Sequence, residues 1–148
     1  MSIPEKLAQE IKASMLAKNA DRLSTLRMLK AAVGYAQIEL KTESLSDAQW
    51  VAIIQKEVKK RRDACEQFEK GGRPELAAKE RLEAATLEEF LPAQLNEADL
   101  AAIIQKTIQE LGATSKKEMG SVIKAVQAKV AGSADGKAIS SAVAKLLP

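Results

Sequence analysis

The apolar residues of this chain recur at spacings of three and four along nearly its whole length, and this periodicity constrains the fold most. Such spacing stacks side chains on one face of a helix. No stretch of useful length alternates apolar and polar residues, which is the pattern of a half-buried strand. Aromatic residues make up only 3% of the chain, so its interior must be built mainly from aliphatic side chains. The sequence therefore predicts an all-α fold.

Capping residues, glycines and prolines divide the apolar stripes into seven predicted helices. Ser46 and Gln49 have the spacing of a capping box at the start of the third helix. Gly71-Gly72 supplies the left-handed positions that end this helix, and Pro74 suits the first turn of the fourth. Pro92 ends the fourth helix, because the residue before a proline resists helical geometry.

The segment Leu91-Pro92-Ala93-Gln94-Leu95-Asn96 is typical of a hinge between two helical units. We predict an N-terminal four-helix domain over residues 1–92 and a C-terminal three-helix domain over residues 96–148. The second domain has only about fifty residues, which is small for an independent core. We expect it to be marginally stable alone or to lean on the first domain.

Two of the predicted helices in the first domain carry stripes that indicate its core. The stripe of the fourth helix is Leu76, Leu82 and Phe90. In the third helix, Cys65 shares the apolar stripe and is expected to be a small core residue. The full stripe of that third helix is Trp50, Ile54, Val58, Cys65 and Phe68.

The chain lacks the residues that usually carry catalysis. It has no histidine, and Cys65 is its only cysteine. Nucleophilic catalysis near neutral pH needs a serine, cysteine or threonine beside a base, most often histidine. No glycine-rich phosphate loop follows a strand, and one cysteine with scattered carboxylates is not a zinc-binding set. The sequence therefore predicts no catalytic residue, metal or cofactor, and favours binding as the function.

The chain also shows no targeting or membrane signal. Its first residues, MSIPEKLAQEIKA, carry charges throughout and lack the apolar stretch of a signal peptide. No run approaches the ~20 apolar residues that a membrane-spanning helix needs. The expected location is the cytoplasm.

A first basic cluster lies on the third predicted helix. The interleaved acidic residues Glu57, Asp63, Glu66 and Glu69 can pair with it at helical spacings and lower its potential. A solvated charged face is favoured over a phosphate site, so we treat this cluster as a secondary basic face. Its members are Lys56, Lys59, Lys60, Arg61 and Arg62, extended by Lys70 and Arg73.

A second basic cluster lies in the C-terminal domain. From Gly112 onward six lysines face only two acidic residues, which leaves a net charge of +4. Such asymmetry is typical of a phosphate-binding surface. Ser115 and Glu118 fit a capping box, so Lys116 and Lys117 would sit at a helix N-terminus, where backbone N–H groups favour an anion. The candidate nucleic-acid-binding residues are Lys116, Lys117, Gly120, Lys124 and Lys137.

Six segments occur in the order expected for a known family: Leu26–Ala32, Lys56–Arg62, Gly71–Glu80, Phe90–Leu95, Lys117–Gly120 and Ala134–Lys137. They resemble the LRxLxxA, KEVKKR, GGRxDLAxKE, YLPxQL, KDMG and ADGK motifs of the YqeY family. The resemblance spans nearly the whole chain.

The resemblance implies a tRNA-related role. The YqeY family is related to the C-terminal tail of the GatB subunit of the tRNA-dependent amidotransferase, and similar modules are appended to some glutaminyl-tRNA synthetases. That tail contacts the elbow region of tRNA and has no catalytic residues. Ser121 stands where relatives often have a lysine. The resemblance then implies either a weaker phosphate contact here or a contact carried by Lys116 and Lys124.

Three functions remain open from the sequence. The leading one is a non-catalytic tRNA-binding accessory protein linked to tRNA-dependent amidation or aminoacylation. The second is a protein-interaction module that acts on an amidotransferase, a synthetase or another translation factor. The third is glutamine-dependent carbon–nitrogen ligase activity, a label that relatives inherit from GatB although this chain lacks the catalytic cradle of that subunit.

Overall fold

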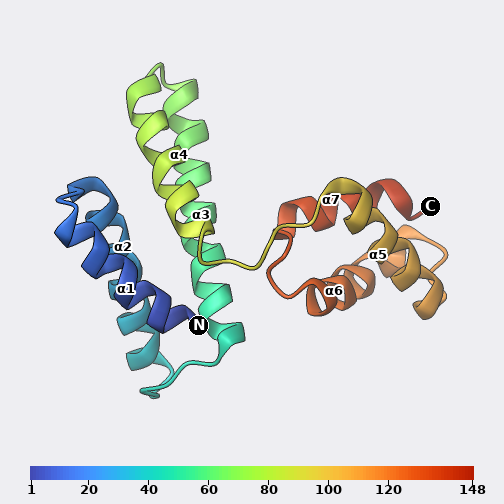
Figure 1. Ribbon diagram of the computed structural model, residues 1–148. Coiled ribbons are helices and arrows are strands. Elements are labelled where there is room, and N and C mark those ends of the chain that lie inside the picture. Colours follow the sequence, from blue (N-terminus) through green and yellow to red (C-terminus); the bar gives the residue numbers. More distant parts are fainter. The chain divides into compact units, whose positions relative to one another are not determined.

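The computed structural model describes residues 1–148 and confirms the all-α prediction. It contains seven α-helices and one short 3-10 helix, with no strand. The chain divides into two compact units, Met1–Leu91 and Pro92–Pro148. Each unit has its own hydrophobic core, and the two cores share no residue. Figure 1 follows the chain from the blue N-terminus to the red C-terminus.

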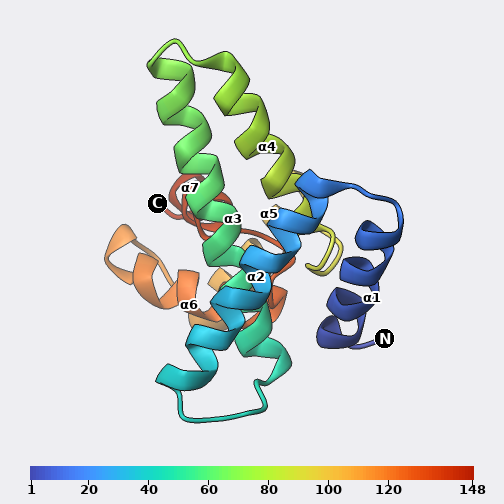
Figure 2. The same cartoon turned by 90° about the vertical axis from the view of Figure 1, so that its left-hand side faces the viewer.

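The first unit contains four helices, α1 (Ile3–Leu16), α2 (Ala20–Glu39), α3 (Asp47–Lys70) and α4 (Pro74–Glu88). The helices α3 and α4 lie side by side as a long hairpin in both views (Figures 1 and 2). The helix α2 packs against α1 and also against both helices of the hairpin. The core of this unit therefore lies where α2 meets the hairpin.

The local signals for the hairpin behave as predicted except at Gly71, which has φ = −84° and is not left-handed. The capping box at the start of α3 is present, because the Gln49 N–H donates to Ser46 Oγ at 3.2 Å and the Ser46 N–H donates to Gln49 Oε1 at 2.8 Å. Gly72 adopts φ = 69°, a left-handed conformation that glycine tolerates best. Pro74 is the first residue of α4. These residues fix where α3 ends and where the chain turns back.

Four predicted core residues of the hairpin are not fully buried: Leu82 is exposed, and Cys65, Phe68 and Leu76 are half-buried. Leu82 is 64% exposed, because at 100° per residue it lies about 160° around α4 from the buried Ala84. Cys65 is half-buried rather than part of the core, and Arg81 donates a hydrogen bond to its sulfur at 3.5 Å. The fourth helix also ends at Glu88, earlier than predicted, although Phe90 is buried beyond its end.

The second unit packs α5 (Glu97–Leu111), α6 (Met119–Val130) and α7 (Gly136–Leu146) pairwise against one another. Asn96 caps α5 by accepting the Asp99 N–H at 2.8 Å, and Gly112 ends it with φ = 64°. The core of this unit is entirely aliphatic: Leu100, Ile104, Val122, Val126, Val130, Ala134, Ile139, Val143 and Leu147.

The predicted hinge is partly built into the second unit. The Leu95 N–H donates to the Ser133 carbonyl at 2.8 Å, and Gln94 Nε2 donates to the Gly132 carbonyl at 3.0 Å. Both acceptors lie in the turn between α6 and α7. Gln94 and Leu95 are therefore held by this turn and do not act as a free linker.

None of the helices is both long enough and apolar enough to cross a membrane.

Candidate nucleic-acid interface

The predicted start of the sixth helix at Ser115 is one turn too early. Residues Lys116–Glu118 form a 3-10 turn, and α6 begins at Met119. The Glu118 carboxylate accepts the N–H of Thr114 at 2.5 Å and the N–H of Ser115 at 3.3 Å. These two N–H groups are thus paired within the chain, and a phosphate could use them only by displacing Glu118.

Three predicted site lysines remain available around this turn. Lys116, Lys117 and Lys124 are exposed, and none of them makes an ion pair. Gly120 lies between Lys117 and Lys124 at helical spacing, and a Cβ added to it would meet no atom within 4 Å. Packing inside the chain therefore does not require glycine at this position, and the surface beside the lysines is bare.

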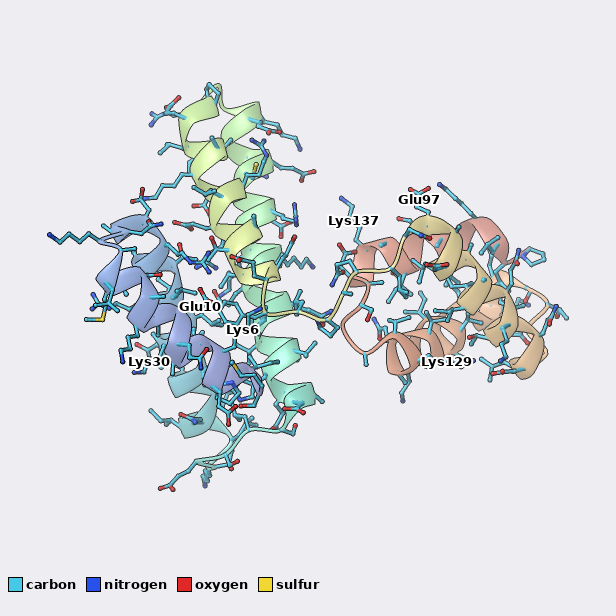
Figure 3. The ribbon with its side chains drawn as sticks, in the orientation of Figure 1. Lys6, Glu10, Lys30, Glu97, Lys129 and Lys137 are labelled. Atoms are coloured by element: carbon cyan, nitrogen blue, oxygen red, sulfur yellow. The ribbon has the colours of Figure 1, made fainter.

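Lys137 lies in the first turn of α7, which begins beside α6. Asp135 caps α7 by accepting the Ala138 N–H at 2.6 Å. A Cβ added to Gly136 would lie 3.9 Å from Nε2 of Gln127, which is on α6 one turn beyond Lys124. Figure 3 shows the Lys137 side chain extending away from this helix start. The candidate residues thus come from the 3-10 turn, from α6 and from the start of α7, whose Gly136 lies next to α6.

Lys129 belongs to the same basic segment but serves another purpose. Its Nζ donates to Thr107 Oγ1 at 3.0 Å and to Glu110 at 2.6 Å, both on α5. The hydrogen bond from Lys129 lowers the pKa of the Glu110 carboxyl below its ordinary value. Lys129 therefore ties α6 to α5 and is not free to bind phosphate.

The secondary basic face is partly neutralised by neighbours. Lys60 pairs with Glu57 at 3.4 Å, and Arg62 pairs with Glu88 of α4. Four of the predicted members are exposed and make no ion pair, namely Lys56, Lys59, Lys70 and Arg73. The secondary basic face therefore has fewer unpaired basic side chains per residue of chain than the segment from Lys116 to Lys124.

Arg61, in the middle of the first basic cluster, is not part of any surface. It is only 5% exposed and lies on the apolar stripe of α3, three residues after Val58. Its guanidinium donates to Glu57 Oε2 at 2.8 Å, and its Nε lies 3.4 Å from Glu83 Oε2 on α4. It also contacts the sulfur of Met28 on α2 at 3.9 Å. Arg61 is therefore a buried link between three helices.

Comparison with known protein families identifies the family to which this chain belongs. A family model described as YqeY-like protein matches residues 4–147, which is nearly the whole sequence. The chain belongs to the YqeY family. The resemblance read from its motifs is thereby confirmed.

Two curated relatives are similar to parts of this YqeY-family chain. An uncharacterized protein of Schizosaccharomyces pombe is 37% identical over 53% of the chain. Altered inheritance of mitochondria protein 41 of Eremothecium gossypii, which its name assigns to mitochondria, is 31% identical over 73% of the chain. The matches span 63% and 60% of the relatives' own lengths.

Proposed function

We propose that this YqeY-family protein is a non-catalytic RNA-binding accessory protein whose second unit holds the backbone of a tRNA. The observation that carries the proposal is a set of exposed lysines without ion pairs on the 3-10 turn and on α6, namely Lys116, Lys117 and Lys124, in a segment of net charge +4. Lysines in such a position attract phosphates and release counterions from the nucleic acid. Lys137 at the start of α7 extends this surface.

The composition of the second unit favours a folded RNA. No phenylalanine, tryptophan or tyrosine occurs after Phe90, so this unit offers no aromatic surface on which single-stranded bases could stack. Recognition through backbone and shape is typical of double-helical RNA instead. The choice of tRNA rests on the resemblance to the GatB tail. In this proposal the four helices of the first unit form an N-terminal domain and the second unit is the tail-like domain.

The test is a salt titration of tRNA binding by the full chain and by a Lys116→Ala/Lys117→Ala/Lys124→Ala variant. Each lost phosphate contact should flatten the slope of log K against log salt by roughly 0.7 to 0.9, so the triple variant should lose about two to three units of slope. Binding of wild type and variant should be measured by fluorescence anisotropy of labelled tRNA between low and physiological salt.

A matched control removes three other exposed lysines that make no ion pair: Lys12, Lys79 and Lys106. This variant has the same net charge as the first one but should keep most of the wild-type slope. Equal slopes for both variants would contradict the proposed site. Release of ammonia from glutamine by the purified chain alone would contradict the non-catalytic part of the proposal.

A substitution at Gly120 is expected to change the folding stability and the tRNA affinity in opposite directions. Replacing Gly120 with alanine should raise the free energy of unfolding by about 0.5–1 kcal/mol, because glycine inside a helix costs backbone entropy and the added Cβ has open space. If an RNA backbone lies close to α6 here, the same substitution should weaken tRNA binding. Chemical denaturation followed by circular dichroism measures the first effect, and the tRNA titration measures the second. A variant that is both more stable and unchanged in RNA affinity would place the RNA away from Gly120.

A further inference from the structure

The helix α2 carries two apolar faces, and only one of them is covered. Leu26, Leu29 and Val33 face the core of the first unit and are buried. On the opposite side, Met28, Ala31, Tyr35 and Ile38 follow one another at intervals of three, four and three residues, which places them in one row. Tyr35 is 74% exposed and Ile38 is 77% exposed, so no helix of the first unit covers the part of the row around these two residues, whereas Met28 at its other end contacts Arg61 of α3.

A basic row runs beside the exposed apolar row. Arg27, Lys30 and Lys41 are exposed and make no ion pair. Gly34 lies one turn after Lys30 on α2, and a Cβ added to it would meet no atom within 4 Å, whereas Lys41 lies just beyond the end of the helix. We call the two rows together the outer α2 face.

The space at Gly34 opens into a shallow hollow at the end of α2. Its volume is about 530 Å³, and more of its lining is apolar than polar. Because glycine has no side chain, a partner's backbone or a bulky apolar side chain can approach α2 closely at this point. The residues that line the hollow are Gly34, Gln37, Ile38, Lys41, Thr42 and Glu43.

We propose that the outer α2 face binds an acidic amphipathic helix of a partner protein, independently of RNA binding by the second unit. The helical part of the face, from Arg27 to Glu39, extends about 18 Å at 1.5 Å per residue, which matches about three turns of a partner helix. The partner's apolar side chains would pack against Tyr35 and Ile38 and into the hollow at Gly34. Acidic residues along one edge of the partner would pair with the basic row.

Charge and chemistry disfavour the other occupants of this face. A second copy of the chain would bring the row of Arg27, Lys30 and Lys41 toward an identical row, and like charges at an interface are costly. An RNA backbone would gain nothing from the exposed apolar row. An anionic membrane surface is negative throughout and would also face Glu43 at the hollow and Glu39 on the last turn of α2, whereas a partner helix can carry its acidic residues only on the edge beside Arg27 and Lys30.

The proposal can be tested with the full chain and a synthetic helical peptide of about 18 residues, which spans the face. The peptide carries leucines at helical spacing on one side and glutamates along one edge of that side. We expect saturable binding of this peptide, measured by isothermal titration calorimetry, and none of a version with lysine in place of each glutamate. A scrambled peptide of the same composition controls for net charge.

Two variants of the chain locate the binding. Gly34→Gln fills the hollow and is compatible with the fold, because the added side chain begins in open space. It should weaken the acidic peptide about tenfold or more, while Leu82→Ser, at an exposed leucine of α4, should not. An Arg27→Glu/Lys30→Glu variant should lose the acidic peptide and bind the lysine peptide. Each of these results would support the outer α2 face as the binding site.

Three results would overturn the proposal. The first is no binding of the acidic peptide by the wild-type chain. The second is binding that Gly34→Gln and the charge reversal leave unchanged. The third is that the outer α2 face mediates self-association, vesicle binding or tRNA binding, seen as loss of one of these in the Gly34→Gln variant. Because tRNA binding is expected to be unchanged in that variant, the test is independent of the proposed function.

Discussion

Replacing Arg61 with alanine is expected to lower the free energy of unfolding of the first unit by about 3–5 kcal/mol, the cost of removing one partner from a buried ion pair. The guanidinium is almost completely buried between α2, α3 and α4. Its removal leaves the carboxylates of Glu57 and Glu83 in a low-dielectric site without this partner, and it leaves a cavity in the hairpin. Urea denaturation followed by the fluorescence of Trp50, the only tryptophan and part of this core, measures the loss.

The variant Arg61→Met/Glu57→Gln/Glu83→Gln is the matched control for this loss. It removes the guanidinium together with both carboxylates and keeps a side chain of similar length in the buried position. Replacing a whole buried ionic group is often nearly neutral, so this variant should recover most of the stability that Arg61→Ala loses. A loss below about 1 kcal/mol for Arg61→Ala, within the range of an exposed ion pair, would contradict the structural role of Arg61.

The stability difference between wild type and Arg61→Ala should depend on pH. Burial raises the pKa of Glu57, but the hydrogen bond from Arg61 and the charges of Lys60 and Arg61 lower it more, so the folded-state pKa lies below the ordinary 4.5. A carboxyl with a lowered pKa contributes stability above its unfolded pKa and loses it as pH falls through the folded pKa. The difference should therefore be complete at pH 7 and shrink as the solution is acidified below pH 4.5.

Arg61 also shows which features of a buried residue the helical pattern of the sequence predicts and which it does not. Its position on the stripe of Trp50, Ile54 and Val58 is visible in the sequence, because the intervals are four, four and three residues. The residue type argues against burial, since arginine is rarely buried unless it is paired. One partner, Glu57, lies four residues earlier on the same helix, but Glu83 and Met28 are contributed by α4 and α2, and Met28 is 33 residues away along the chain. Sequence spacing alone does not bring such partners together.

The lysines of α6 also show that helical spacing does not determine which basic side chains of the candidate site are free to bind phosphate. Lys124 and Lys129 lie in one helix and count equally toward the net charge that predicted a phosphate-binding surface. Only the packing of α5 shows that Lys129 is held by Thr107 and Glu110, whereas Lys124 makes no ion pair. Local signals such as the capping boxes and Gly112 follow from nearby residues and were predicted correctly. Interactions between helices depend on three-dimensional packing, which the spacing does not determine.

Replacing Ile104 with alanine is expected to unfold most of the second unit and to abolish RNA binding. Ile104 is completely buried at the centre of an aliphatic core, and such a truncation costs about 2–5 kcal/mol. Domains are stable by roughly 0.05–0.15 kcal/mol per residue, which gives about 3–9 kcal/mol for a unit of this length. A small unit buries a smaller share of its surface and belongs at the lower end of that range. The loss therefore approaches the whole stability of the second unit.

Because the two units have separate cores, Ile104→Ala should destabilise the second unit and leave the first unit folded. In the Ile104→Ala variant, amide hydrogen exchange should become fast throughout α5, α6 and α7, while the denaturation curve reported by Trp50 should keep the wild-type midpoint. The matched variant Leu29→Ala truncates a buried leucine of the first core and should do the reverse, shifting the Trp50 midpoint and leaving tRNA affinity intact. If Ile104→Ala also shifts the Trp50 midpoint, the two units unfold as one. If it unfolds the second unit without reducing tRNA affinity, the RNA is bound elsewhere on the chain.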